Sequence, residues 1–286
     1  MGFLRLIRIN NLFIIVLTLT GVWYGTVHSL ILNANFICYL LVILFTILIA
    51  GAGNAINDYF DVKVDRINRP NRQVIEKTIK KRWAIIIHWG FNLIALVISV
   101  YLSIHLHSWF YVFIHLFATT LLWVYSIFLK RVYFISNLCI SVLVALVPIL
   151  GYKTMLDLDL VIVDMRFPML LILGAFVTNL TREIIKDIQD MEGDRIRHVK
   201  SIAIISGKKT ARRWAMAIQF LLVPLFVVSY LIMNTNSSSM LVITYYTSIG
   251  FGILALFSIL IGIKESWVSM ILKASMIIGT LTFYTL

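Results

Sequence analysis

The sequence predicts an all-α fold: a polytopic membrane protein with nine transmembrane helices. Hydrophobic residues make up 60% of its 286 residues, whereas soluble proteins are about 45–50% apolar. The mean hydropathy is +0.94. The apolar residues fall in long blocks, and a helix needs about 20 of them to cross a bilayer. Because such blocks fill the chain, we expect one membrane-embedded domain over residues 1–286 and no second, soluble domain.

Each helix is expected from one apolar block with short polar flanks. The first block follows Arg5 and Arg8. We interpret it as a retained membrane helix, because more apolar blocks follow and no small-residue cleavage site closes it cleanly. The second and sixth blocks end in clusters of acidic residues, and the others end in short polar loops. The blocks, with approximate edges, lie at residues 11–28, 36–57, 83–103, 108–128, 134–152, 168–186, 212–233, 240–262 and 267–285.

The basic residues predict how these helices are oriented. With the N-terminus inside, 23 of the 25 Lys and Arg residues fall on inner segments, and only Lys153 and Arg166 fall on outer loops. Cytoplasmic loops carry such an excess of basic residues. We therefore expect the N-terminus on the cytoplasmic side of the plasma membrane and the C-terminus outside. Membrane orientation accounts for the net charge of +12, so no nucleic-acid partner is predicted.

Nine of the 13 acidic residues fall in two windows, 58–76 and 183–194, both on the predicted inner side. In the first window Asn57, Asp61 and Asp65 are four residues apart and share one helix face, which Asp58 joins. The two windows are separated by four helices, which suggests an internal duplication of helices 1–4 and 5–8. In the second window, a continuous helix would place on one face Asn179, Glu183, Asp187, Asp190 and Asp194.

Two stripes of carboxylates on one side of the membrane indicate a cation site. Like charges side by side are destabilising, and the cost rises at a membrane interface. Oxygen ligands without His or Cys suit Mg²⁺, which is usually held by a few carboxylates and substrate phosphates. One such stripe alone would ordinarily be a solvated helix end. The basic residues nearby could hold the remaining oxygens of a diphosphate: Arg69, Arg72, Lys130, Arg182 and Lys186.

These motifs resemble the signatures of the UbiA superfamily of intramembrane prenyltransferases. Asn57-Asp58-x-x-Asp61-x-x-x-Asp65, followed by Arg69-Pro70-x-Arg72, is similar to the first signature. Asp187-x-x-Asp190-x-x-x-Asp194, preceded by Arg182-Glu183 and Lys186, is similar to the second. A weaker third match is Tyr125-Ser126-x-x-Leu129-Lys130-Arg131. With nine predicted helices, the resemblance covers the whole chain.

The resemblance implies a helical bundle around a central cavity, with the two acidic loops as a cap over a diphosphate on the inner side. It implies Mg²⁺-dependent transfer of a prenyl group from a prenyl diphosphate to a lipophilic acceptor. The implied metal ligands, direct or through water, are Asn57, Asp58, Asp61, Asp65, Asp187, Asp190 and Asp194, and the aspartates other than Asp58 form the implied catalytic group. The implied substrate-binding residues are Asn57, Arg69, Arg72, Tyr125, Lys130, Arg182 and Lys186.

The motifs define the acceptor less closely than the prenyl diphosphate donor. The second window, followed by Ser201-Ile-Ala-Ile-Ile-Ser-Gly207, looks most like the branch that joins a geranylgeranyl group to geranylgeranylglyceryl phosphate. An aromatic acceptor, such as 4-hydroxybenzoate or a naphthoate, is the alternative. The phosphate of a lipid acceptor would need further basic residues, and those to spare are Arg8, Arg195, Arg197, Lys200, Lys208 and Lys209.

Two other classes of protein share some of these features. A cation-binding transporter would also be polytopic, but its site would lie at mid-membrane on broken helices, and here we expect uncharged helix centres. A prenyl-chain elongating synthase also pairs two Asp-rich helices, but in a soluble fold, which the nine predicted spans disfavour.

Overall fold

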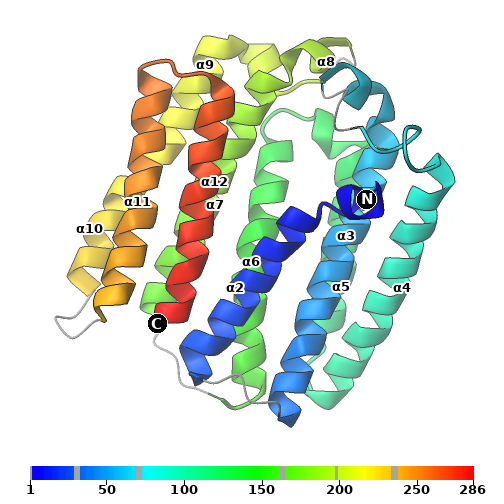
Figure 1. The fold of residues 1–286 in the computed structure, drawn as a ribbon, viewed down its shortest axis with the longest axis vertical. Helices are drawn as coiled ribbons and strands as arrows, with labels where there is room; N and C mark the ends of the chain where they lie inside the picture. Colours follow the sequence, from blue (N-terminus) through cyan, green and yellow to red (C-terminus); the bar gives the residue numbers. More distant parts are fainter. Residues whose placement is uncertain (1, 29–32, 69–72, 161–164, 197–198, 233–237) are drawn as a thin grey trace.

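The computed structural model describes residues 2–28, 33–68, 73–160, 165–196, 199–232 and 238–286. Its regular structure in these ranges is helical, apart from an isolated bridge between Ile75 and Ile79. Figure 1 shows long helices that run side by side in one bundle. In chain order the helices are α1 (Gly2–Leu6), α2 (Ile9–Val27), α3 (Ala34–Asn68), α4 (Lys81–His105), α5 (Phe110–Ile127), η1 (Leu129–Arg131), α6 (Ile135–Asp157), α7 (Arg166–Gln189), α8 (Met191–Ile196), α9 (Ile202–Phe220), α10 (Leu222–Ile232), α11 (Ser239–Leu260), α12 (Glu265–Thr282) and η2 (Phe283–Thr285).

Within the described ranges, nine segments are long and apolar enough to cross a membrane, which confirms the predicted number. The chain is a multi-pass membrane protein. The helical segment of the seventh span joins α9 and α10 and begins at Ile202, ten residues before the predicted apolar block. The added residues are a polar stretch of α9 that carries Lys208, Lys209, Arg212 and Arg213. The chain bends within this span at Gly207, whose φ of +80° suits a residue without a side chain. It breaks again before α10, because Pro224 has no N–H to bond the carbonyl of Phe220.

Two groups of helices form the bundle. In one, α3 packs against α4 and α5, around a core that includes Phe45, Leu102 and Tyr111. In the other, α7 packs against α9 and α12, around a core that includes Ile184 and Leu272. Helices α2 and α6 connect the groups, since α2 contacts α3, α6 and α12, and α6 contacts α7. The space enclosed by α2, α3, α5, α6 and α7 holds the two main cavities of the site described below.

Gly21 and Gly25 allow the C-terminal turn η2 to lie against α2. A Cβ atom at Gly21 would come 2.8 Å from the ring of Tyr284, and one at Gly25 would come 2.0 Å from the carbonyl oxygen of Phe283. Both distances are too short for real contacts, so these glycines serve close packing within the membrane.

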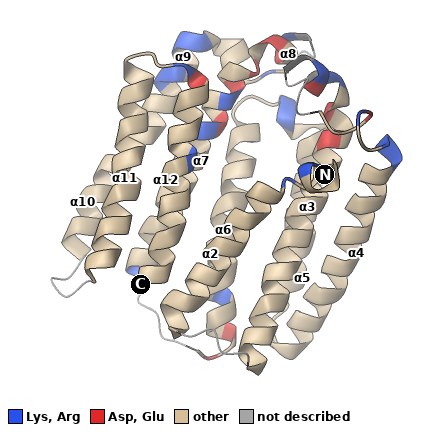
Figure 2. Cartoon of the chain, in the orientation of Figure 1, with Lys and Arg blue, Asp and Glu red and all other residues tan. Residues whose placement is uncertain are grey.

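Charged residues concentrate at one end of the bundle. Figure 2 shows most of the blue and red segments at the upper end, around α8, α9 and the end of α3. Helix α3 runs without a break to Asn68, past the end of its membrane span at Lys63. The first acidic stripe therefore lies on one continuous helix, as predicted.

The second acidic window is not one helix. Helix α7 ends at Gln189, Asp190 follows as its C-cap, and α8 begins at Met191. The prediction of one continuous stripe as far as Asp194 is therefore wrong beyond Gln189. Acidic side chains at the C-terminal end of a helix oppose its dipole, and Gly193 further weakens a helix here.

The expectation of uncharged helix centres is also wrong at one position. Lys273 lies within α12, eight residues after Glu265 at the start of that helix. At about 1.5 Å per residue this is about 12 Å into the span.

Candidate active site

The end of α3 carries a face of polar side chains. The amide of Asn57 donates from Nδ2 to Oδ2 of Asp61 at 2.9 Å, and Lys130 of η1 forms an ion pair with the same carboxylate. Asp61 is 3% exposed. Arg8 donates to Asp58 at 2.8 Å. Two carboxylates of the stripe are thus held by cations from different elements, and Asp61 is fixed from both sides.

Asp65 lies one turn beyond Asp61, outside the membrane span that ends at Lys63. Burial raises the pKa of its carboxyl, and the charges of Asp61 and Asp58 raise it further, to about 6. The ionised form of Asp65 is therefore disfavoured among these neighbours. A divalent cation beside the stripe would reverse this effect, because it would be the largest local charge.

Helices α6 and α7 place a second group opposite the first. Asn137 of α6 donates from Nδ2 to Oδ2 of Asp187 at 2.9 Å, and Asn137 is 2% exposed. One turn before Asp187, the carboxylate of Glu183 accepts from Lys186 at 2.5 Å and lies 3.4 Å from Arg182. Glu183 is thus neutralised locally, whereas Asp187 is oriented by a neutral amide.

The turn after α7 folds back over the site. The N–H of Asp194 donates to the carbonyl of Asp190 at 3.1 Å, and the N–H of Val199 donates to the carbonyl of Asp194 at 3.0 Å. The N–H of Lys200 donates to the carbonyl of Arg131 at 3.1 Å, which ties this segment to η1. Asp194 is 8% exposed. The break in the helix thus turns Asp194 inward.

These side chains line a cavity of about 110 Å³, here called the polar cavity. It brings together the two acidic groups that the sequence predicted, from α3 and from α7–α8. Among the other predicted residues, Arg182 lines the neighbouring cavity and Asp58 contacts Arg8, while Arg69 and Arg72 lie outside the described residues. The polar cavity is lined by Arg8, Asn57, Asp61, Asp65, Tyr125, Lys130, Ser136, Asn137, Glu183, Lys186, Asp187, Asp190, Asp194 and Val199.

A larger cavity of about 320 Å³, here called the apolar cavity, adjoins the polar cavity. Its walls come mainly from α2, α3, α5 and α6, with residues such as Ile14, Phe45, Ile49, Leu122 and Val147. The residues common to both cavities are Arg8, Asn57, Tyr125, Glu183 and Lys186. A molecule with an anionic end and an apolar body could therefore bind across the two.

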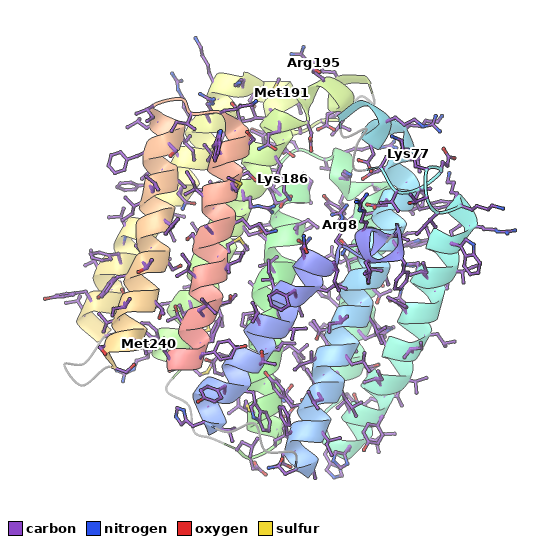
Figure 3. All side chains as sticks on the ribbon, in the orientation of Figure 1. Arg8, Lys77, Lys186, Met191, Arg195 and Met240 are labelled. Atoms are coloured by element: carbon purple, nitrogen blue, oxygen red, sulfur yellow. The ribbon has the colours of Figure 1, made fainter. Side chains whose placement is uncertain are left out.

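Figure 3 shows the level at which the cavities meet. Lys186 and Arg8 lie in the upper part of the bundle, below Met191 and Arg195 of α8, while Met240 lies at the opposite end. The junction is thus close to the charged end.

The donor atoms of the polar cavity fit Mg²⁺. They are carboxylate and amide oxygens, which hard divalent cations prefer. Oδ1 of Asn57 is buried and has no hydrogen-bond partner, although buried acceptors are normally satisfied. Among the described residues, no three His, Cys, Asp or Glu side chains converge closely enough to hold a metal by themselves. A Mg²⁺ ion here would therefore need additional oxygens from phosphate or water, as is usual for this ion.

A family model described as the UbiA prenyltransferase family matches residues 14–277. The chain belongs to the UbiA prenyltransferase family. This confirms the resemblance inferred from the motifs, and the match covers nearly the whole UbiA chain.

Several relatives of this UbiA chain are named digeranylgeranylglyceryl phosphate synthase. The one from Methanosphaera stadtmanae is 36% identical over 163 residues, which cover 56% of this chain and 55% of that protein. The one from Pyrococcus horikoshii is 36% identical over 171 residues, which cover 59% of this chain and 57% of that protein. The matches thus span little more than half the length of these relatives.

Solved structures share the UbiA fold over the full chain. One, from work on digeranylgeranylglyceryl phosphate synthase in membranes, is 26% identical with a TM-score of 0.68, and the match covers 99% of this chain and 96% of that one. A UbiA homolog from Archaeoglobus fulgidus bound to DMAPP and Mg²⁺ is 17% identical with a TM-score of 0.67, and the match covers both chains fully. At that identity the second likeness concerns the fold alone.

The sequence did not predict Ser136, Asn137 or Val199 of the polar cavity, nor Lys273 of the apolar cavity. Asn137 contacts Asp187 across 50 positions of the chain, and only its polarity near the start of an apolar block marks it. Lys273 lines the apolar cavity, although the charge distribution placed it among the 23 basic residues of the inner segments.

Proposed function

We propose that this UbiA-family protein transfers a geranylgeranyl group from geranylgeranyl diphosphate to the free hydroxyl of geranylgeranylglyceryl phosphate, with Mg²⁺ as cofactor. The observation that carries the proposal is the junction of a carboxylate-lined polar cavity with an apolar cavity. A prenyl diphosphate has the matching parts, an anionic head and an apolar tail. The names of the relatives support the choice of acceptor.

The polar cavity would hold the metal and the diphosphate. When bound, Mg²⁺ would offset the charge that develops on the departing diphosphate. Asn137 orients Asp187, and Lys130 and Asn57 orient Asp61. The residues that would hold Mg²⁺, directly or through water, are Asn57, Asp61, Asp65, Asp187, Asp190 and Asp194.

The reaction exchanges one carbon–oxygen bond for another. The bond between the first prenyl carbon and the diphosphate breaks, and the diphosphate leaves with the electron pair. The acceptor hydroxyl oxygen bonds to that carbon, and its proton passes to a carboxylate of the cap or to water. Lys130, Lys186 and Arg8, which line the polar cavity, would stabilise the negative charge as it grows.

The apolar cavity would hold the prenyl tail and keep water from the allylic carbon. Exclusion of water matters because the donor would otherwise be hydrolysed. Tyr125 lines both cavities, so it lies at the junction where the reacting carbon would be placed.

We also propose that the polar cavity faces the cytoplasm at the plasma membrane. The distribution of basic residues supports this orientation, because the charged end of the bundle carries both the cavity and most Lys and Arg residues. The match of one family model to residues 14–277 supports a single domain, and the duplication of helices 1–4 and 5–8 remains a prediction.

Competition between acceptors tests the function. Purified protein in lipid receives geranylgeranyl diphosphate, Mg²⁺ and an equimolar mixture of geranylgeranylglyceryl phosphate, 4-hydroxybenzoate and 1,4-dihydroxy-2-naphthoate, and mass spectrometry identifies the products. We expect the ether lipid to dominate. Dominance of a prenylated aromatic would contradict the acceptor assignment, and the absence of any prenylated product and of diphosphate release would contradict prenyl transfer.

Variants test the site. Asp61→Ala and Asp190→Ala should abolish transfer, because each removes a carboxylate of the cation site. EDTA should abolish it too, because it removes the cation. Glu192→Ala is the matched control, since Glu192 lies on α8 but is exposed and does not line the polar cavity. Full turnover in either aspartate variant would refute the role assigned to that residue.

A further inference from the structure

The apolar cavity carries a basic end, near its junction with the polar cavity and α12. Four basic residues line it against a single carboxylate, that of Glu183, and they are Arg8, Arg182, Lys186 and Lys273. Lys186 and Arg182 already share Glu183, at 2.5 and 3.4 Å. The lining itself therefore has a formal charge of +3, and Asp58 outside the lining balances the charge of Arg8 at 2.8 Å. Ionised side chains in a largely hydrocarbon setting are costly and usually functional.

The polar cavity has the opposite balance. Six carboxylates line it against three basic residues, Arg8, Lys130 and Lys186, and the carboxylates are those of Asp61, Asp65, Glu183, Asp187, Asp190 and Asp194. Its formal charge of −3 suits divalent cations that bridge to a diphosphate. A second anion without metal would be repelled there, and would be attracted to the basic end of the apolar cavity instead. The two cavities thus separate two kinds of anionic ligand.

Lys273 and Arg182 are the basic residues that line the apolar cavity without lining the polar cavity. Lys273 projects from α12, and Arg182 from the adjacent α7, which packs closely against α12. An anion held by these two side chains would lie beside the junction of the cavities, across from the groups that would hold the diphosphate.

A third cavity adjoins the apolar cavity beside α12. This side cavity, of about 80 Å³, lies among α2, α6, α7, α10, α11 and α12, and its lining is mainly apolar. It shares Ile14, Thr18, Val144 and Met276 with the apolar cavity. Met276 is three residues after Lys273, on the same face of α12. A chain attached to an anion at Lys273 would thus pass Met276 and enter the side cavity, which has room for the start of that chain.

We infer that Lys273 and Arg182 bind the phosphate monoester of the lipid acceptor, and that the acceptor chain enters the side cavity past Met276. This inference rests on the proposed function, since it assigns the second substrate of the same reaction. The donor chain then lies against α3, α5 and α6 and the acceptor chain against α7, α11 and α12. The phosphate fixes the glycerol at the junction, so the nearby hydroxyl faces the allylic carbon.

The first test removes the charge of Lys273. Lys273→Met keeps the length of the side chain, and Lys273→Arg keeps its charge. Initial rates are measured against geranylgeranylglyceryl phosphate, against geranylgeranylglycerol without the phosphate, and against geranylgeranyl diphosphate. In Lys273→Met we expect the KM for the phosphorylated acceptor to rise at least tenfold, with the KM for the donor and the rate with geranylgeranylglycerol changed less than twofold. Lys273→Arg should restore most of the lost affinity.

Lys264→Met is the matched control, because Lys264 precedes α12 and is exposed. It should leave all three constants unchanged. An unchanged acceptor KM in Lys273→Met overturns the inference while the proposed function stands. A wild-type protein that prenylates only aromatic acceptors overturns the acceptor assignment and this site with it.

The second test fills the side cavity. Gly174 of α7 lines it, and a Cβ atom there would meet nothing within 4 Å. Gly174→Leu should raise the KM for the geranylgeranyl acceptor at least fivefold and spare an acceptor with a short chain. Gly250→Leu is the control, since Gly250 is an exposed glycine of α11 that also has open space around its Cβ position. A rise in donor KM with an unchanged acceptor KM would place the donor chain in the side cavity and overturn the inference. This variant also keeps the inference falsifiable should Lys273→Met fail to fold.

Discussion

Asn137 offers a direct test of how the polar cavity is supported. Asn137→Ala removes the 2.9 Å hydrogen bond to Asp187. It leaves every carboxylate of the polar cavity in place. A hydrogen bond to a charged group contributes about 1.5–3 kcal/mol. Since 1.4 kcal/mol corresponds to about tenfold in an equilibrium constant, Mg²⁺ affinity should fall about 10- to 100-fold, the range typical for residues that orient metal ligands. The maximal rate at saturating Mg²⁺ should fall much less.

The assay is diphosphate release as a function of Mg²⁺ concentration, together with the Tm of the purified protein. Asn92→Ala is the matched control, because Asn92 is a buried amide that accepts from Thr119 at 3.0 Å and lies away from the carboxylates. Both variants should lose similar stability, and only Asn137→Ala should need more Mg²⁺. An unchanged Mg²⁺ requirement in Asn137→Ala, or an equal shift in Asn92→Ala, would refute the reasoning.

Three further predictions concern topology, packing and charge. In a cysteine-free background, a cysteine at position 35 should react with an impermeant reagent added outside cells and one at position 205 should not; the reverse pattern would contradict the orientation. Gly25→Leu should lower the Tm by a clear margin through its clash with Phe283, an overpacking cost of about 1–3 kcal/mol or more, whereas equal Tm values for Gly25→Leu and Gly250→Leu would contradict that contact. Asp65 has its pKa raised to about 6, above its unfolded value, so its ionisation should lower the stability of metal-free protein as pH rises from about 4 to above 6. Mg²⁺ should restore that loss at pH 7 and have little effect at pH 5; a Mg²⁺-induced gain in Tm that is the same at both values would contradict the reasoning.

The sequence predicted the number of membrane spans because hydrocarbon thickness fixes the length of an apolar block. It did not predict the ends of every helix. Helix α9 begins at Ile202 because the side chain of Ser201 accepts a hydrogen bond from the N–H of Ile204. The polar residues around this point do not by themselves show whether the chain is a loop or a helix. The break at Gln189 was also missed, because a helical wheel assumes a continuous helix and assigns residues beyond a break to the same face.

The site was predictable where it depends on spacing within one helix. Asn57 and Asp61 lie one turn apart and bond as that spacing implies. Contacts between helices were not predictable in this way, since a single sequence does not reveal that Asn137 faces Asp187. Lys273 was misplaced for another reason: a lone lysine near the edge of an apolar block is ordinarily a topology signal, and only its position in α12 shows it to face a cavity.

The direction of the helices adds an independent argument for cations in the polar cavity. Asp61 and Asp65 lie near the C-terminal end of α3, and Asp187 and Asp190 lie at the C-terminal end of α7. A helix C-terminus carries partial negative charge, so acidic groups in its last turn, here Asp65, Asp187 and Asp190, are unfavourable by about 0.3–1 kcal/mol each. Stability alone would favour Lys or Arg at these positions, or Asp at the opposite ends. Two helices direct their negative ends and their carboxylates toward one cavity. Water screens this concentrated negative charge poorly at a membrane interface. Divalent cations would offset this charge at both helix ends at once, so the arrangement that weakens the metal-free fold would favour binding of a diphosphate together with Mg²⁺.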